Sequence, residues 1–328
     1  MRSSRRMLAA VAIGTVLATA GGLAQPAAAA TRVPIREFRV PTPGSRPYQI
    51  TAGPDGNLWF TEADAGAIGR ITPKGKVTEY PIRKGGGPYG ITVGPDGNLW
   101  FTERYADMIA KFDPYTGTLL AEYAVTSFSQ PWDITTGPDG RLWFTEEDID
   151  QIGRMSTDGS FVEFPAGCTS CFPTEITAGS DGNLWFTAEL ANAVGRITPQ
   201  GDVNLFTAPT ASLLYGITKG PDGNVWFTAL VGDRKVGRIT PSGRIREFAV
   251  PADGTGVAGI TTGPDGNLWL TENDIGRIMA ITTRGRPVAV GRTSDSGSYP
   301  IGIAAGPDGN VWFAESQASA IGRAKLGA

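Results

Sequence analysis

A repeat of about 42 residues constrains the fold of this chain more than any other feature of the sequence. Seven tryptophans mark it, with spacings of 41, 43, 42, 41, 43 and 43 residues, at Trp59, Trp100, Trp143, Trp185, Trp226, Trp269 and Trp312. Each lies in a similar phrase, clearest at residues 90–103 as GITVGPDGNLWFTE. The copies fill residues 31–328, so the chain must form a repeat architecture.

One copy is typical of four short strands. In the first copy these are residues 50–52, 58–61, 68–72 and 77–80, and an Asp-Gly turn at 54–57 joins the first two. Helical repeats would show a 3.6-residue period, which is not seen here. Four strands in about 42 residues, seven times over, predict an all-β fold, a seven-bladed β-propeller.

The two ends of the repeat array indicate how the ring closes. The last copy stops after its third strand, residues 321–325. The N-terminal segment 35–41 reads IREFRVP and nearly copies the fourth-strand segment 245–251, IREFAVP. We therefore expect an N-terminal strand to complete the last blade, within one propeller domain at residues 31–328.

Residues 1–30 have the pattern of a secretory signal peptide. Arg2, Arg5 and Arg6 precede an apolar run at 7–20, and small residues follow up to Ala30. We expect a secreted protein, exported by the general secretory or the twin-arginine route, with no transmembrane segment.

Composition excludes several classes of function. The chain has no histidine, which rules out a histidine base, a Ser-His-Asp triad and histidine metal ligands. Its 29 basic and 32 acidic residues give a net charge of −3, so no basic face for nucleic acid is expected.

The two cysteines, Cys168 and Cys171, are three residues apart. Zinc would need two further cysteine or histidine ligands, and the sequence has none. An exported chain favours a local disulfide, with a redox role as the alternative.

Residues present in nearly every copy are interpreted as structural. The Asp-Gly pairs form turns rather than calcium loops, and the tryptophans pack between blades rather than stacking on sugars. A glutamate such as Glu62 ends the second strand in five copies, and an arginine such as Arg70 follows on the third strand, which suggests cross-strand ion pairs.

Variation between copies indicates a ligand site at the mouth of the central channel. The residues two before each first-strand isoleucine form a ring of Tyr48, Tyr89, Trp132, Thr174, Tyr215, Ala258 and Ile301. We expect ligand binding by Tyr48, Tyr89, Trp132 and Tyr215. Fourteen residues after the ring come the glutamates Glu62, Glu103, Glu146, Glu272 and Glu315, expected around the same mouth.

Two kinds of chemistry are then available at this mouth. Glu315 and Glu272 are candidate ligands of Mg²⁺, and a solvated acidic rim is the alternative. Tyr89 and Glu315 are candidate catalytic bases.

The phrases PYGIT, GPDGNLWFTE, IGRIT and EYP resemble the virginiamycin B lyase family, the streptogramin B lyases. The resemblance covers residues 33–326 and implies a magnesium-dependent elimination that opens a cyclic depsipeptide at its ester bond. It also implies that Tyr48 contacts substrate, that Glu315 serves the metal site, and that essential histidines belong at Ala258 and Ile301.

This chain has alanine and isoleucine where the resemblance implies histidines, and three functions are then open. The first is a lyase-like propeller that binds a small-molecule or peptide-like ligand at the channel mouth. The second is a diverged carbon-oxygen lyase with a tyrosine or glutamate base, and the third is a structural or interaction propeller at the cell surface. We expect a monomer in each case.

Overall fold

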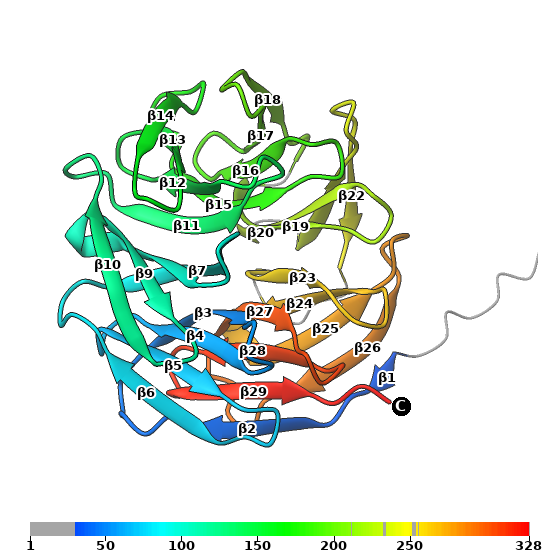
Figure 1. Cartoon of the computed structure of the whole chain (residues 1–328). Helices are drawn as coiled ribbons and strands as arrows, with labels where there is room; N and C mark the ends of the chain where they lie inside the picture. The colour runs from blue at the N-terminus through cyan, green and yellow to red at the C-terminus, as the bar shows by residue number, and fades with distance from the viewer. Residues whose placement is uncertain (1–29, 211, 232–233, 251–253, 255, 328) are drawn as a thin grey trace, which may run out of the picture.

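The computed structural model describes residues 30–327 apart from 211, 232–233, 251–253 and 255, so the predicted signal peptide, except Ala30, lies outside the described residues. Seven separate sheets form a ring around a central axis (Figure 1). The predicted all-β, seven-bladed propeller is confirmed. In the described part of the chain, no helix is long and apolar enough to cross a membrane.

Each of blades 1–5 is an antiparallel sheet of four strands that follow one another along the chain. Blades 1–3 comprise β3 (Pro47–Ala52), β4 (Leu58–Glu62), β5 (Ala67–Ile71), β6 (Val77–Pro81); β7 (Pro88–Val93), β8 (Leu99–Glu103), β9 (Met108–Asp113), β10 (Thr118–Ala124); β11 (Pro131–Thr136), β12 (Leu142–Glu146), β13 (Gln151–Met155), β14 (Phe161–Pro165). Blades 4 and 5 comprise β15 (Pro173–Ala178), β16 (Leu184–Ala188), β17 (Ala193–Ile197), β18 (Val203–Thr207); β19 (Ser212–Lys219), β20 (Val225–Val231), β21 (Lys235–Ile239), β22 (Ile245–Ala249).

Blades 6 and 7 include strands from the N-terminal segment. Their consecutive strands are β23 (Ile260–Thr262), β24 (Leu268–Glu272), β25 (Arg277–Ile281), β26 (Pro287–Arg292); β27 (Pro300–Ala305), β28 (Val311–Glu315), β29 (Ala320–Ala324). β2 (Ile35–Arg39) pairs antiparallel with β29 and closes the ring as predicted, visible in Figure 1 as blue beside red. The short β1 (Thr31–Arg32) adds a parallel edge strand to β26, which was not predicted. Two 3₁₀ turns, η1 (Arg104–Ala106) and η2 (Asn273–Ile275), follow the second strands of blades 2 and 6.

The core lies between the blades, where the tryptophans pack as predicted. Trp312 of blade 7, for example, packs against Ile50 and Leu58 of blade 1, and all seven repeat tryptophans are at most 1% exposed. The indole N–H of Trp59 donates to Asp55 of the preceding turn at 3.0 Å, and the same bond recurs in every blade. The turn aspartate therefore also fixes the tryptophan rotamer, a role that the sequence analysis missed.

The predicted cross-strand pairing of glutamate with arginine is wrong in blade 1, although blade 6 has such a pair, Glu272 with Arg277. Arg70 lies opposite Trp59 and stacks over its ring at 5.6 Å, whereas Glu62 lies opposite Ala67. Because successive residues of a strand point to opposite faces, Trp59 and Glu62 lie on different faces of the sheet.

Cys168 and Cys171 form the predicted disulfide, with Cα atoms 5.8 Å apart. The bridge lies in the loop before β15. Asp150 also holds this loop by accepting the N–H groups of Ser170, Cys171 and Phe172.

Candidate functional site

Aromatic side chains from four blades meet at one end of the central channel. Tyr48, Tyr89 and Tyr215 form one apolar cluster with Trp132 beside them. The ring centroids of Tyr48 and Tyr89 are 4.2 Å apart, and the Tyr48 and Tyr215 hydroxyls are 2.6 Å apart across the channel. The four residues predicted from the repeat are therefore gathered in one place, and ligand binding by them stays a prediction.

Threonine hydroxyls hold this ring in place. In blade 2, Thr102 Oγ1 accepts the Gly90 N–H at 2.9 Å and donates to the Trp132 carbonyl of the next blade at 2.9 Å. The bond to the next blade is made by Thr61, Thr102, Thr145, Thr187, Thr228 and Thr271. Blade 7 has Ala314 at this position. The threonine of the repeated LWFTE phrase thus links every ring residue except Tyr48 to the preceding blade.

Most of the aromatic ring is buried against itself. Tyr48, Tyr89 and Tyr215 are 7%, 1% and 5% exposed, whereas Trp132 is half-buried. Above the ring lies a cavity of about 350 Å³, which we call the mouth, lined by Arg46, Tyr48, Arg104, Trp132, Glu147, Glu189, Tyr215, Leu230, Ala258, Asn273, Tyr299 and Ile301. The polar groups that a ligand would meet there are mainly residues that the sequence analysis did not select.

The prediction that the five glutamates surround this mouth is wrong. Glu62, Glu103, Glu146, Glu272 and Glu315 are all fully buried, and none of them is among the residues that line the mouth. Several residues that line the mouth come directly after one of these glutamates in the sequence, as Arg104 follows Glu103 and Glu147 follows Glu146. A shift of one residue along a strand moves a side chain to the opposite face, so the strand end was correct but the face was not.

Basic, acidic and aromatic side chains line the mouth together. Arg104 forms an ion pair with Glu147, and its guanidinium lies 4.3 Å from the centroid of the Trp132 ring. Arg46 donates to the Tyr89 hydroxyl at 2.9 Å. Burial raises the pKa of Glu189, and the nearby Glu147 carboxylate adds to the rise. Guanidinium groups on aromatic rings, together with carboxylates and apolar residues, suit a ligand that carries apolar rings and polar groups.

The Tyr89 environment does not favour a catalytic base. Burial raises the pKa of its phenol, and a hydrogen bond with the Tyr105 hydroxyl at 2.9 Å raises it further, against the lowering effect of Arg46. Tyr89 therefore keeps its proton near neutral pH.

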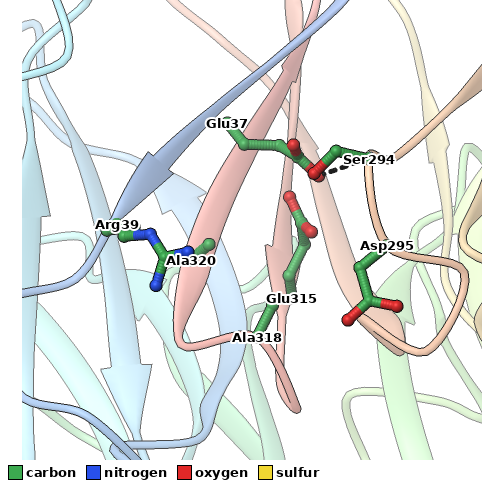
Figure 2. Close-up of a pocket in the computed structure, with 7 residues that line it drawn as sticks. All are labelled: Glu37, Arg39, Ser294, Asp295, Glu315, Ala318 and Ala320. Atoms are coloured by element: carbon green, nitrogen blue, oxygen red, sulfur yellow. Dashed lines mark hydrogen bonds between the residues drawn. The ribbon is translucent and has the colours of Figure 1, made fainter.

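Glu315 and Glu272, the predicted metal residues, lie in different surroundings. Glu315 faces a separate cavity of about 440 Å³ that Glu37, Asp295 and Ser294 also line (Figure 2). Burial and the Glu37 carboxylate raise the pKa of Glu315 to about 8. Glu272 is bound by the Arg277 guanidinium at 2.5 and 2.6 Å, which leaves it a poor metal ligand.

Two oxygen groups of the kind that Mg²⁺ prefers, the carboxylates of Glu315 and Glu37, line this cavity, although no group of three acidic, histidine or cysteine side chains in the described part of the chain could hold a metal ion. Both oxygens of Glu315 lack a hydrogen-bond partner among the described residues, and Glu37 and Asp295 add two carboxylates to the same cavity. Mg²⁺ prefers such oxygen ligands and keeps several waters, which this volume accommodates.

Two buried carboxyl groups beneath the ring were also missed. Asp133 accepts the Ile176 N–H at 3.0 Å, and Glu175 accepts the Ile217 N–H at 3.3 Å. Burial raises the pKa of Asp133 to about 7, and burial together with Asp133 raises that of Glu175 well above its usual value. Both directly follow ring positions, where four other blades have glycine, and this was the available sequence signal.

Comparisons with known proteins agree on one family. The profile described as "Virginiamycin B lyase family" matches residues 33–214 and 211–327. The virginiamycin B lyase of Saccharopolyspora erythraea is 52% identical over 50 residues, which are 15% of this chain and 17% of that protein. The chain thus aligns with only about a sixth of the length of this curated relative.

Solved structures match over much more of the chain. A catalytically inactive histidine-to-alanine variant of virginiamycin B lyase from Staphylococcus aureus, with quinupristin, is 36% identical at a TM-score of 0.84, covering 90% of this chain and 99% of that one. A streptogramin B lyase structure is 34% identical at a TM-score of 0.84, covering 90% and 98%.

Proposed function

We propose a function for this chain, which belongs to the virginiamycin B lyase family. It binds a small-molecule or peptide-like ligand at the mouth and does not cleave the ring of that ligand. The observation that carries the proposal is the pair Ala258 and Ile301, which line the mouth where the family resemblance places histidines. The chain has no histidine elsewhere to replace them. The mouth is thus a ligand-sized cavity without the family's proton-transfer groups.

The relative from Staphylococcus aureus supports a separation of binding from turnover. Its variant with one histidine changed to alanine is described as catalytically inactive, and its structure is one with quinupristin. In this chain both histidine positions are apolar, so we propose the same separation here.

In this proposal Arg104, Arg46 and Trp132 make the main contacts with the ligand. The two guanidinium groups would bind carbonyl or carboxylate oxygens, and the half-buried Trp132 would stack on an apolar ring. The buried Tyr48, Tyr89 and Tyr215 would form the floor of the site.

Magnesium remains part of the proposal at Glu315 and Glu37, which line the second cavity. When bound there, Mg²⁺ would supply positive charge to these two carboxylates. Neither carboxylate lines the mouth, so the ion would not contact the ligand.

The alternative of a diverged lyase has less support. Tyr89 keeps its proton, and Glu315 faces another cavity. We also propose that the protein is exported, which the disulfide and the sequence of residues 1–30 support, and that it is a monomer.

Calorimetry with quinupristin as the probe tests the proposal. We expect wild type to bind, and Arg104→Ala and Trp132→Ala to weaken binding about tenfold or more. Tyr115→Ala is the matched control, since Tyr115 is 69% exposed and its hydroxyl contacts Pro54 of a turn at the opposite end. No binding by wild type, or equal binding by all variants, would contradict the mouth as the site.

A further inference from the structure

A polar pocket recurs between the second and fourth strands of several blades. In blade 1, Glu62 lies opposite Ala67, and the position of Gly69 lies opposite Glu79. Phe60 pairs with that same glycine, so Phe60, Glu62 and Glu79 share one face of the sheet. Only two small residues separate the two carboxylates, which therefore lean over the same space.

This pocket places two buried polar groups, the Glu62 carboxylate and the Ser45 hydroxyl, beside the better solvated Glu79. Glu62 and Ser45 are fully buried, and neither the Glu62 carboxylate nor the Ser45 hydroxyl has a hydrogen-bond partner in the described part of the chain. Glu79 is half-buried and is held by Thr42, whose N–H and Oγ1 donate to its two oxygens at 2.9 Å. A buried, unpartnered carboxylate is strongly destabilising, so something must supply a proton or positive charge.

Blade 3 repeats the arrangement. Glu146 and Ser129 are fully buried and unpartnered among the described residues. Glu163 lies on the same face of the sheet and accepts Thr126 Oγ1 at 2.6 Å. The two pockets offer the same set of groups, two carboxylates and a hydroxyl.

In blade 6 the same position between the strands has only one carboxylate, and a basic side chain binds it. Its fourth strand has Val290 where blade 1 has Glu79, and the remaining Glu272 is bound by Arg277 at 2.5 and 2.6 Å. The position of Arg277 in blade 1 is Ala67. A guanidinium thus binds the remaining carboxylate in the blade that lacks the second acidic side chain.

Blades 4 and 5 follow the same rule. Blade 5 has Ala229 on the second strand, and Lys235 Nζ lies 3.7 Å from Glu247 on the fourth. Blade 4 has Ala188 and Leu205, which pack in an apolar cluster. A blade with one carboxylate has a basic side chain, and the blade with none is apolar.

Blade 2 differs from blades 1 and 3, whereas blade 7 has the same arrangement of two carboxylates and a serine, Ser298. In blade 2, Arg83 lies 3.9 Å from Glu122, and the place of the serine is Gly86. In blade 7, Glu315 and Glu37 line the cavity discussed above for magnesium (Figure 2). Blades 1, 3 and 7 keep two carboxylates with no basic side chain at the position of Arg277, where they have Ala67, Gln151 and Ala320.

We propose that the blade 1 pocket binds a hard divalent cation through Glu62, Glu79 and Ser45. The blade 3 pocket binds a second one through Glu146, Glu163 and Ser129. Ca²⁺ is the fitting probe, because it accepts oxygen ligands in flexible geometry and matches two negative charges. No three acidic, histidine or cysteine side chains among the described residues form a metal-binding group, so waters would complete each shell. The half-buried Glu79 and Glu163 provide the way in.

Metal analysis tests the two sites. Protein stripped with a chelator, equilibrated near pH 8 with about 1 mM Ca²⁺ and desalted is analysed by mass spectrometry for bound calcium, since weak oxygen sites have Kd values of about 0.1–1 mM. Equilibrium dialysis with ⁴⁵Ca²⁺ measures the same stoichiometry without a desalting loss. We expect the double variant Glu62→Gln/Glu146→Gln to bind two fewer ions per chain than wild type.

A designed control copies blade 6 into blade 1. The variant Ala67→Arg/Glu79→Val supplies a guanidinium to Glu62, as Arg277 does for Glu272, and we expect it to lose one ion while its melting temperature in chelator is kept or raised. Equal calcium binding by wild type and the Gln variant would overturn the proposal. So would a wild-type melting temperature that falls from pH 5 to 8 equally with and without Ca²⁺, because that result indicates a shared proton.

Discussion

The threonine links between blades lead to a direct stability prediction. Thr102 is fully buried, and its hydroxyl both accepts the Gly90 N–H and donates to the Trp132 carbonyl, each at 2.9 Å. Thr102→Val keeps the shape of the side chain but leaves both backbone groups buried and unpaired. Each such group costs about 1–3 kcal/mol, so we expect a loss of about 2–4 kcal/mol in the free energy of unfolding.

Thermal unfolding followed by circular dichroism measures this loss. At about 2 °C per kcal/mol for a domain of this size, the melting temperature should fall by about 4–8 °C. Thr102→Ser is the matched control, because it keeps the hydroxyl and removes only a methyl group. The hydrogen-bond account would be refuted if Thr102→Val melted within about 1 °C of wild type, or if the serine variant lost more than the valine variant.

Three further predictions concern the buried glutamates, the disulfide and a turn aspartate. Burial raises the pKa values of Glu62, Glu103, Glu146 and Glu315 to about 8. The folded state thus binds more protons than the unfolded state, so in chelator the melting temperature should be highest near pH 4–5 and fall up to about pH 8, while a rise over this range would contradict the assignment. Replacing Cys168 and Cys171 by serine opens a loop of sequence separation 3 and should cost about 2 kcal/mol by loop entropy, measured by urea unfolding, with an unchanged midpoint as the contrary result. Asp96→Ala removes the acceptor of the Trp100 indole at 3.0 Å and the partner of Lys111 at 2.8 Å, and should cost about 1–3 kcal/mol in the same assay, whereas an exposed control, Asp202→Ala, should cost under about 0.5 kcal/mol.

The fold could be predicted almost fully from the sequence, because the spacing of the repeat tryptophans gives the length of one blade directly. Each Trp has the same neighbours in every blade, and the turn glycine before it, such as Gly97, has the positive φ of 77° that its Asp-Gly turn requires. The closing strand at Ile35–Arg39 was likewise visible as a copy of a fourth strand. The edge strand Thr31–Arg32 was not, since two residues carry no periodic signal.

The site could be predicted only in part. The ring of Tyr48, Tyr89, Trp132 and Tyr215 follows from the repeat, since equivalent positions must meet around the axis. The glutamates were assigned to the mouth because each ends the second strand of a hairpin whose first strand begins at the ring. The pairing of the strands agrees, since Glu62 lies opposite Pro47. Which face they use depends on the pleat and on the bulge at 47–50, and a shift of one residue reverses it.

Contacts between blades were the other part that the sequence did not reveal. The Thr102 hydroxyl reaches Trp132, thirty residues away, only because the next blade is rotated over it. The internal comparison that assigns the carboxylate pockets likewise needs the register, which places Glu79 on the face of Glu62.

The central claim is that the mouth binds a ligand that the protein does not open. Elimination leaves the mass unchanged, so the direct measurement is chromatographic retention and fragmentation of quinupristin recovered after incubation with saturating protein and Mg²⁺. We predict only the intact cyclic compound, recovered in the protein-bound fraction. Linear product formed by the wild-type chain would contradict the account, because it would require a base that neither Ala258 nor Ile301 supplies.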